Sequence, residues 1–389
     1  MQIVLFEDHL WSRFLPLVYT RPVGDLRMGM YTMAERYAKL LNMEAVHETR
    51  VPLHSIFAAS SAQLQLHISA RLFPTLALRE ALQSMQPGDT LVHGSDVLAR
   101  CIDTHTQHSE HTIPFESEPI WIETLTDLFS KNAMAITFDA TLTSNATHPS
   151  PLHASNTLIG DPKLLFIHPS ATVYATTFNT NEGPIFIDAN AEIMEGTHIR
   201  GPFYLGKHST LKLGTRVYGA TTIGPHCKVG GEISNSIFWG YSNKAHDGFV
   251  GNSIIGEWCN LGADTNTSNL KNNYSSVKIW SYVKGDFADT GLTFCGLIMG
   301  DHSKCGINTM FNTGTVAGVG ANIFGGGFPN KHLPSFSWGG AEGMETYDLD
   351  KAFATIEKVM QRRSLPLTTE IKTLLTRVFE DTSHQRHPS

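Results

Sequence analysis

Residues 187–229 read IDANAEIMEGTHIRGPFYLGKHSTLKLGTRVYGATTIGPHCKV, and every sixth residue of this stretch is a branched aliphatic. The positions are Ile187, Ile193, Ile199, Leu205, Leu211, Val217, Ile223 and Val229. Ordinary sequence, in which roughly a fifth of residues are Ile, Leu or Val, rarely produces such a run. In a parallel β-helix each short strand points one residue inward, and that residue stacks on its counterpart in the coil below. The period of six therefore predicts a left-handed parallel β-helix of hexapeptide repeats.

A six-residue spacing returns after a gap, with one polar interruption. We expect further inward residues at Ile237, Phe249, Ile255 and Leu261. Asn243 falls on the same register and is the missing aliphatic position. Residues 241–248, YSNKAHDG, should therefore leave the wall of the β-helix as a loop or a distorted coil. A polar break in a regular solenoid is where a functional site is expected.

The spacing resumes after an irregular stretch. Residues 274–294 show no period and predict an insertion. Beyond the insertion, the six-residue spacing is kept by Met299, Cys305, Phe311, Ala317 and Ile323. We therefore expect coils to continue to about residue 325.

Residues 1–145 predict a separate α/β domain. A strand over 3–6 precedes helical periodicity over 30–41, and a second helix over 75–85 precedes a strand over 90–93. Alternating strands and helices imply a mostly parallel sheet. We expect a linker over 146–160, which is rich in Thr, Ser, Asn, His and Pro, and the β-helix over 161–330. Two helices, over 349–363 and 368–379 within a C-terminal segment 345–382, should cap the last coils.

Composition argues against several classes of protein. The formal net charge of −7, without a run of Lys or Arg, argues against a nucleic-acid partner. No apolar stretch is long enough to span a membrane, and the first residues carry acids where a signal peptide needs bases, so we expect a cytoplasmic protein. The 5 cysteines form no C-x-x-C motif, which predicts reduced, buried thiols rather than disulfides or a zinc ribbon.

His246 is the candidate for catalysis within the polar break. An imidazole titrates near neutral pH, which suits proton abstraction. The chain has 19 histidines, however, and a given histidine is more often a surface or packing residue than a catalyst. Position alone therefore leaves both interpretations of His246 open.

The segment 243–269 resembles a known enzyme family. That family is the bifunctional N-acetylglucosamine-1-phosphate uridylyltransferase/glucosamine-1-phosphate acetyltransferase family, whose acetyltransferase half carries K-x-x-H, a Gly, I-G-x-x-x-N-I-G-A-G-T and a later Asn. The corresponding residues here are Lys244, His246, Gly251, Ile255, Gly256, Asn260, Gly262, Ala263, Thr265 and Asn269, with Lys244 one residue closer to the histidine than in the family. Further departures are Phe249, which stands for a Tyr, and Asn235 or Ser236, which stands for a phosphate-binding Lys.

The resemblance assigns roles to these residues. It implies that His246 deprotonates the amine of a sugar, because an amine must be unprotonated to attack a thioester. It implies acetyl-CoA as acyl donor, with the backbone at Ala263 meeting it, and a homotrimer with the CoA arm between neighbouring β-helices. The residues expected to bind the acceptor are Lys244, Asn260, Asn269 and, one coil earlier, Arg216.

The first domain carries a fainter resemblance to the nucleotidyltransferase half of the same family. Those proteins have L-x-x-G-x-G-T-R after the first strand, whereas residues 5–13 read LFEDHLWSR and keep no glycine. The resemblance implies that Arg13 and Arg21 contact a nucleoside triphosphate. It also implies that Asp96, in a G-S-D-V sequence similar to G-D-V, binds Mg²⁺, although an Asp after a strand is more often a turn residue. Nearly the whole chain is similar to a variant subfamily described as sugar nucleotidyltransferases.

These observations favour acetyl transfer from acetyl-CoA to an amino-sugar phosphate such as glucosamine-1-phosphate. Nucleotidyl transfer by the first domain, from a nucleoside triphosphate and a sugar phosphate, would then give a product such as UDP-N-acetylglucosamine. Two alternatives stay open: a nucleotidyltransferase with a structural β-helix, and a non-catalytic scaffold that senses sugar nucleotides. A carbonic anhydrase built on a β-helix is disfavoured, because the coil histidines form no H-x-x-x-x-H pair.

Overall fold

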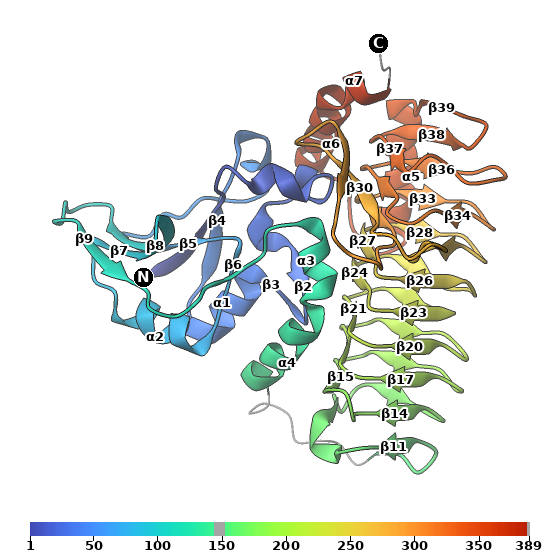
Figure 1. The fold of residues 1–389 in the computed structure, drawn as a ribbon, viewed down its shortest axis with the longest axis horizontal. Helices are drawn as coiled ribbons and strands as arrows, with labels where there is room; N and C mark the ends of the chain where they lie inside the picture. The colour runs from blue at the N-terminus through green and yellow to red at the C-terminus, as the bar shows by residue number, and fades with distance from the viewer. Residues whose placement is uncertain (144–151, 387–389) are drawn as a thin grey trace.

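The structure is a computed structural model that describes residues 1–143 and 152–386. Figure 1 shows an α/β domain lying beside a tall β-helix, with the C-terminal helices packed against the upper coils. The predicted fold class is confirmed: an α/β domain, a parallel β-helix and C-terminal helices. No helix among the described residues is long and apolar enough to span a membrane.

The first domain is built on a six-stranded sheet in the order β4-β1-β5-β8-β7-β9. These strands are β1 (Gln2–Phe6), β4 (Ala45–Glu48), β5 (Leu64–Ser69), β7 (Asp89–His93), β8 (Asp96–Asp103) and β9 (His111–Pro114). Only β8 runs against the others. The chain passes from β1 to β4 on one side and then to β5 on the other, so the carboxyl end of β1 is a topological switch point.

Helices and short segments complete the first domain. The predicted helices are confirmed as α1 (Met33–Leu41) and α2 (Leu76–Ser84), and Thr32 forms a capping box with Glu35 at the start of α1. The other elements are α3 (Leu125–Ser130), α4 (Asn132–Thr143), η1 (Trp11–Phe14), η2 (Leu17–Tyr19), η3 (Val23–Asp25), η4 (Val51–Leu53), β2 (Arg27–Met28), β3 (Tyr31–Thr32), β6 (Leu72–Phe73) and β10 (Ile120–Trp121).

The β-helix has three sheets, which each coil visits in the order I, II, III. Sheet I holds β12 (Leu165–Ile167), β15 (Ile185–Ile187), β18 (Phe203–Leu205), β21 (Thr221–Ile223), β24 (Ile237–Gly240), β27 (Ile254–Glu257), β32 (Ile298–Met299), β35 (Val316–Ala317) and β37 (His332–Leu333). Sheet II holds β13 (Thr172–Val173), β16 (Glu192–Ile193), β19 (Thr210–Leu211), β22 (Lys228–Val229), β25 (Asn243–Lys244), β28 (Asn260–Leu261), β33 (Lys304–Cys305), β36 (Asn322–Ile323), β38 (Ser337–Gly340) and β39 (Gly343–Thr346). Sheet III holds β11 (Thr157–Ile159), β14 (Thr177–Asn179), β17 (His198–Arg200), β20 (Arg216–Tyr218), β23 (Glu232–Ser234), β26 (Phe249–Gly251), β29 (Asn266–Thr267) and β34 (Met310–Phe311).

The aliphatic run of the sequence forms the interior of the β-helix as predicted. All of its members from Ile187 to Val229 belong to one buried cluster. The later positions expected to point inward are confirmed at Ile255, Leu261, Met299, Cys305, Phe311, Ala317 and Ile323. The 5 cysteines are buried and free, also as expected.

The predicted register is wrong between Val229 and Val250. The inward residues there are Ile233, Phe238, Lys244 and Val250, as strand pairing with the coils below shows. Ile237 instead faces the first domain, and Phe249 lies on the outer face of sheet III. Asn243 is likewise not the missing inward position, because Lys244 pairs with Val229.

Tighter corners cause this shift. Gly231, Asn235 and Asn252 have positive φ, at 79°, 46° and 47°. The corners that contain them need fewer residues than a regular corner, as the inward pairs Val229/Ile233, Ile233/Phe238 and Val250/Ile255 show. A shift of one residue exchanges the two faces of a strand, so Ile237 and Asn243, which were predicted to point inward, point outward. Residues 243–244 also remain in the wall as β25 and do not form a loop.

The β-helix begins and ends outside the expected range of 161–330. Its first strand, β11, begins at Thr157 within the expected linker, and residues 144–151 of that region lie outside the described residues. Strands β37 and β38 stack on the last coil beyond residue 325. The insertion is confirmed as a hairpin of β30 (Lys278–Ser281) and β31 (Asp286–Asp289) that packs on the first domain.

The C-terminal helices are confirmed and lie along one corner of the β-helix. They are α5 (Leu349–Gln361), α6 (Thr369–Asp381) and the short α7 (Ser383–Arg386); the 3-10 turn η5 (Pro162–Leu164) lies at the other end of the column. Ile356 and Leu375 pack with Trp258, Val319 and Phe336 at the corner between sheets I and II. They therefore cover the side of the upper coils rather than the end of the column.

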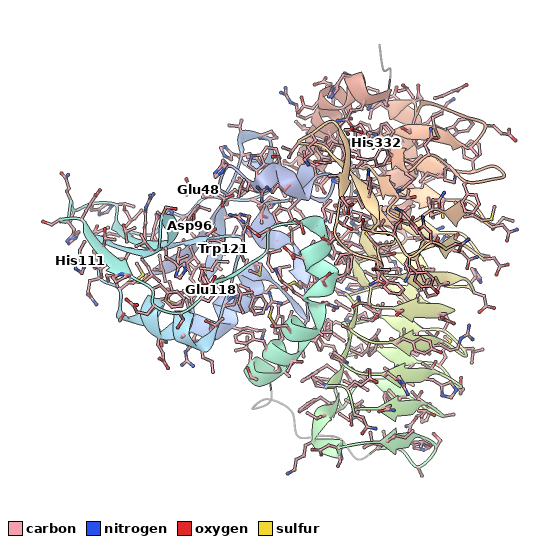
Figure 2. The ribbon with its side chains drawn as sticks, viewed as in Figure 1. Glu48, Asp96, His111, Glu118, Trp121 and His332 are labelled. Atoms are coloured by element: carbon pink, nitrogen blue, oxygen red, sulfur yellow. The ribbon has the colours of Figure 1, made fainter. Side chains whose placement is uncertain are left out.

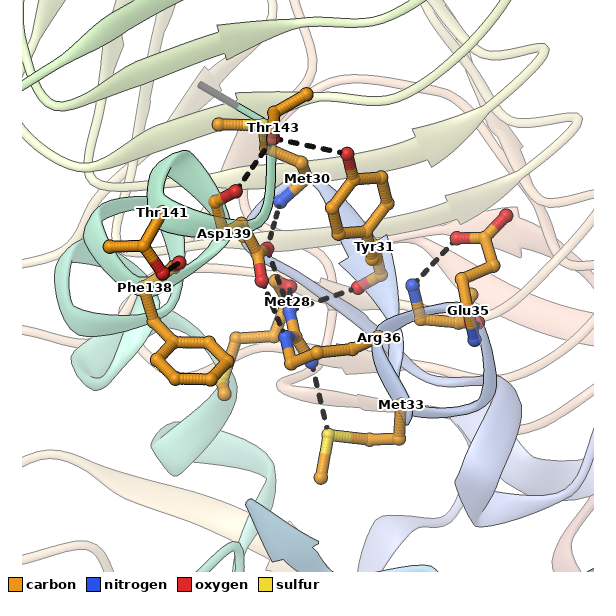
Figure 3. Close-up of polar contacts among 12 residues, drawn as sticks. Met28, Met30, Tyr31, Met33, Glu35, Arg36, Phe138, Asp139, Thr141 and Thr143 are labelled. Carbon is orange, nitrogen blue, oxygen red and sulfur yellow. Dashed lines mark hydrogen bonds and ion pairs between the residues drawn. The ribbon is translucent and has the colours of Figure 1, made fainter. Parts of the chain in front are cut away.

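A buried ion pair inside the first domain and its hydrogen bonds support the turn that contacts sheet I. Arg36 of α1 donates to the Asp139 carboxylate of α4 over 2.7 and 2.9 Å, and both side chains are fully buried (Figure 3). The backbone N–H of Met30 also donates to Asp139, over 2.8 Å. The turn before Met30 reaches the β-helix, because the Thr222 hydroxyl of β21 donates to the Gly29 carbonyl over 2.9 Å.

We predict that Asp139→Ala strongly destabilises the first domain. Removing one partner leaves the Arg36 guanidinium buried without its counter-charge, which costs about 3–5 kcal/mol in comparable sites. Urea unfolding followed by tryptophan fluorescence measures the change. Arg377→Ala, which breaks the exposed pair with Asp381, is the control and should change stability little. Equal stability losses in the two variants would contradict the prediction.

Candidate functional site

His246 lies in the turn between β25 and β26, at the corner between sheets II and III. Its side chain is exposed and forms no hydrogen bond or ion pair with any other described residue. The turn borders an open depression of about 530 Å³. The depression is lined by Met194, Lys212, Leu213, Gly230, Gly231, Ala245, His246, Asp247, Ala263 and Asp264. An unpartnered imidazole beside a depression is free to accept a proton from a bound molecule.

The turn that carries His246 differs from its neighbours in the same column of corners. In most coils a threonine closes this corner by donating to the carbonyl three residues earlier, as Thr215 and Thr265 do over 2.6 and 2.7 Å. The equivalent residue in the His246 coil is Gly248, with φ of 113°. A Cβ there would lie 2.2 Å from the Thr265 carbonyl oxygen, so only glycine fits.

Lys244 takes over the role of the missing threonine from inside the β-helix. Its side chain is fully buried, and its Nζ donates to the carbonyls of His246 and Asp247 over 2.7 and 2.9 Å. Burial lowers the pKa of Lys244 to about 8, although Asp247 and Asp264 oppose that shift. The prediction that Lys244 binds the acceptor is therefore contradicted, because the ammonium group points into the prism and holds the His246 turn.

Only some of the residues expected to bind ligands lie near His246. Ala263 lines the same depression, and Asn260 is exposed on the outer face of sheet II, where β28 continues the ladder above β25. Asn269 follows β29 and donates to Asn252 over 2.8 Å at the opposite end of sheet III. Within one chain, sheet III therefore separates Asn269 from His246.

Arg216 is exposed on the outer face of sheet III. It begins β20, two strands below β26, and its Nε lies 3.6 Å from the Glu232 carboxylate. Phe249 is the next residue in this outer column. Arg216 therefore lies on sheet III, which follows the His246 corner in the chain, and its guanidinium is paired with Glu232.

The residues expected to bind a nucleotide do not share one pocket. Arg13 is exposed on η1 and lines a cavity of about 350 Å³ together with Trp280 and Lys284 of the inserted hairpin. Asp96 is exposed at the start of β8, and Figure 2 shows it in the first domain, away from the β-helix. No three His, Cys, Asp or Glu side chains in the described part of the chain lie close enough together to hold a metal ion.

Arg21 is a structural residue rather than a nucleotide contact. Its side chain is buried, and its Nη2 lies 2.5 Å from Asp301 and 3.3 Å from Glu257, both on the β-helix. The guanidinium also lies 4.7 Å from the ring centroid of Trp239. The prediction for Arg21 is thus wrong, because its guanidinium is buried in ion pairs between the first domain and the β-helix.

Two groups of residues have no counterpart in the sequence prediction. His208, His226, Tyr241, Trp258 and His302 form a continuous stack of rings at the corner between sheets I and II. Each occupies a left-handed corner position, and this shared conformation, rather than metal binding, explains these histidines. The second group lies at the carboxyl end of β1 and consists of two ion pairs, Glu7–Arg50 and Asp8–Arg71. Two acidic residues directly after a strand are the sequence feature that could have indicated this group.

Comparison with known proteins gives one family match and several partial relatives. Residues 3–147 match the family model for a sugar nucleotidyl transferase. Over 154 residues the chain is 34% identical to a bifunctional sugar-1-phosphate nucleotidylyltransferase/acetyltransferase of Sulfurisphaera tokodaii, which covers 39% of this chain and 38% of that protein. Over 87 residues it is 37% identical to the bifunctional protein GlmU of Methanocaldococcus jannaschii, covering 22% of this chain and 21% of that protein. The matched region thus spans well under half of these relatives.

Two solved structures with partial similarity have low sequence identity to this chain. The polysialic-acid-specific acetyltransferase NeuO aligns over 53% of this chain and 94% of its own, with 12% identity and a TM-score of 0.28. A UDP-N-acetylglucosamine acyltransferase of Arabidopsis aligns over 60% of this chain and 92% of its own, with 15% identity and a TM-score of 0.25.

We predict that Lys244→Met stabilises the β-helix relative to the wild type at neutral pH. Methionine restores an apolar interior position between Val229 and Leu261 and removes the cost of a buried charge. The pKa of Lys244 is about 8 in the folded chain and 10.5 in a model compound, so the unfolded state binds more protons between these values. Wild-type stability should therefore rise with pH from about 8 to 10.5 relative to the variant.

Paired urea titrations at several pH values measure this difference. Lys207→Met is the control, because the side chain of Lys207 is exposed on a corner of the same β-helix. A constant difference between wild type and Lys244→Met across this pH range would contradict the assignment of the buried ammonium.

Proposed function

We propose that this chain, which is partly similar to bifunctional sugar nucleotidyltransferase/acetyltransferase proteins, transfers an acetyl group from acetyl-CoA to an amino-sugar phosphate. The observation that carries the proposal is the exposed, unpartnered imidazole of His246, held on a fixed turn beside an open depression. Glucosamine-1-phosphate is the acceptor that we expect. The name of the Sulfurisphaera relative, which includes both activities, supports this choice.

In the proposed reaction His246 acts as general base. The amine of the acceptor attacks the thioester carbonyl, the C–N bond forms, and His246 takes the proton that the amine loses. The C–S bond then breaks, and the CoA sulfur leaves and can receive that proton. Backbone N–H groups at the corner near Ala263 would stabilise the oxyanion, and Asn260 would orient the acceptor.

We propose that a homotrimer completes the site. The corner that carries His246 is free of the first domain and presents exposed apolar side chains, Leu213 below and Ile307 above, with 67% and 70% of their surfaces accessible. Exposed apolar side chains along one edge favour association between copies. Asn269 and Arg216 do not reach the His246 corner of their own chain. In a trimer they would reach a site from a neighbouring copy, or contact the bound CoA.

We predict that His246→Ala lowers the rate of CoA thiol release from acetyl-CoA and glucosamine-1-phosphate by about 10²–10⁴, the usual contribution of a general base. The KM for acetyl-CoA should change little, because the imidazole contacts the acceptor. A thiol-trapping assay measures both quantities. His168→Ala is the matched control, since His168 lies on the first coil, far below His246, and its imidazole hydrogen-bonds to Ser170. Undiminished thiol release by His246→Ala would refute the role of this base.

A second candidate function is nucleotidyl transfer by the first domain, which the match of residues 3–147 favours. Asp96 is exposed and offers one carboxylate to Mg²⁺, which commonly takes its remaining ligands from water and substrate phosphates. Mg²⁺ there would neutralise charge on the triphosphate, and Arg13 would contact the phosphates. A chain active in neither assay would instead support the scaffold alternative.

We predict that Asp96→Asn abolishes pyrophosphate release from UTP and N-acetylglucosamine-1-phosphate in the presence of Mg²⁺. The amide removes the negative charge that holds the ion while keeping the size of the side chain. Glu80→Gln, on the exposed face of α2, is the control and should keep full activity. If the two variants release pyrophosphate equally fast, Asp96 is not a metal ligand.

A further inference from the structure

The carboxyl end of β1 is the place in the first domain where an α/β sheet of this topology binds its ligand. Strands β4 and β5 flank β1, and the chain crosses from one side to the other at this point. Parallel α/β sheets bind ligands in the crevice outside such a switch point. In this chain β1 ends at Phe6, and the next two residues are Glu7 and Asp8.

Each acid is bound by an arginine that follows a flanking strand. Arg50, just after β4, donates from Nε to the Glu7 carboxylate over 2.9 Å. Arg71, just after β5, holds Asp8 with two groups, Nε at 2.8 Å and Nη2 at 2.6 Å from one oxygen. Arginines of two neighbouring strands therefore converge on acids of the strand between them.

Both arginines are fixed in place by aromatic rings and backbone carbonyls. The Arg50 guanidinium lies 3.8 Å from the ring centroid of Trp11, and its Nη2 donates to the Val18 carbonyl over 2.7 Å. The Arg71 guanidinium lies 5.0 Å from the ring centroid of Trp121. Guanidinium groups held in this way are suited to planar, two-pronged recognition of phosphate or carboxylate.

The acids are held as firmly as the arginines. Glu7 accepts the backbone N–H of Val23 over 2.9 Å, and only 4% of its side-chain surface is exposed. Asp8 accepts the N–H of Leu10 over 2.9 Å. Each carboxylate thus combines an arginine with a backbone N–H, the same donors that bind phosphate oxygens in nucleotide sites.

We propose that Arg50 and Arg71 form a polyphosphate-binding site that Glu7 and Asp8 occupy in this structure. The two acids stand where phosphate groups would sit, so a triphosphate must displace them before it can bind. Strands β4 and β5 lie about 10 Å apart, two strand spacings, and a polyphosphate can bridge the arginines between them. The choice of a nucleoside triphosphate as natural ligand rests on the second candidate function.

Removing the negative charges should create an open site. A ligand that binds only when the acids have moved away has its affinity reduced by the small fraction of molecules in that state. We therefore expect the double variant Glu7→Gln/Asp8→Asn to bind inorganic tripolyphosphate at least tenfold more tightly than the wild type. Adding Arg71→Gln should abolish the gain.

Isothermal titration calorimetry with tripolyphosphate tests the proposal without any enzymatic assay. The control is Glu80→Gln/Glu123→Gln, which removes two charges from exposed positions of the same domain and should bind as weakly as the wild type. Pyrophosphate release, measured separately, reports on the second candidate function, so failure of one idea is distinguishable from failure of the other.

Two results would overturn the proposal. The first is equal tripolyphosphate affinity in the wild type and the double variant. The second is tight binding by the wild type that survives Arg71→Gln. If the double variant does not fold, the single variant Asp8→Asn still tests the same idea, because its amide oxygen can accept the Leu10 N–H while the ion pair with Arg71 is lost.

Discussion

The structure depends on one inward side chain per strand stacking on its counterpart in the coil below. This requirement fixes the period of six. It also keeps each strand flat and short, so that a corner follows directly after each strand. It also explains why Lys244 can enter the interior. Its long apolar stem fills the column between Val229 and Leu261, while its ammonium finds two carbonyls at the nearby corner. The column therefore tolerates a charge only where a corner offers acceptors.

The outer face of sheet I imposes a second requirement. Ile237, Trp239, Ile254, Ile298 and Val316 point outward from it and would expose a large apolar surface on a bare β-helix. The first domain and the inserted hairpin cover this surface and join it in a single hydrophobic core. Sheet I is consequently unavailable to other copies, whereas sheets II and III, with the His246 corner between them, keep exposed outer faces.

The sequence predicted those features that follow from a repeating local rule. The aliphatic run, the two long N-terminal helices and the insertion are such features, because each depends on periodicity or its loss. The register near Lys244 escaped prediction, since Ile237 and Phe249 lie at multiples of six before Ile255, whereas the short corner at Asn252 makes the residue after each of them the inward one. His246 was singled out because polar residues around it break the aliphatic pattern, and its catalytic role stays a prediction. The roles of Arg21 and of the Glu7–Arg50 pair depend on contacts between distant segments, which no local pattern reveals.

The joint between the domains limits how this chain can evolve by gaining or losing repeats. The first domain is attached at successive heights of sheet I: at Thr222, at Trp239, whose indole donates to the Arg27 carbonyl, and at Glu257 and Asp301, which hold Arg21. One coil added or deleted between these points would move one attachment about 4.8 Å away from its partner. The first domain also packs on Phe186 of β15 and Tyr204 of β18, and Val316 of β35 belongs to the shared core, so coils can be duplicated without that penalty only outside the part of the column from β15 to β35. Insertion of coils is therefore compatible with the domain contacts only near the ends of the β-helix, and the number of coils between those contacts is fixed.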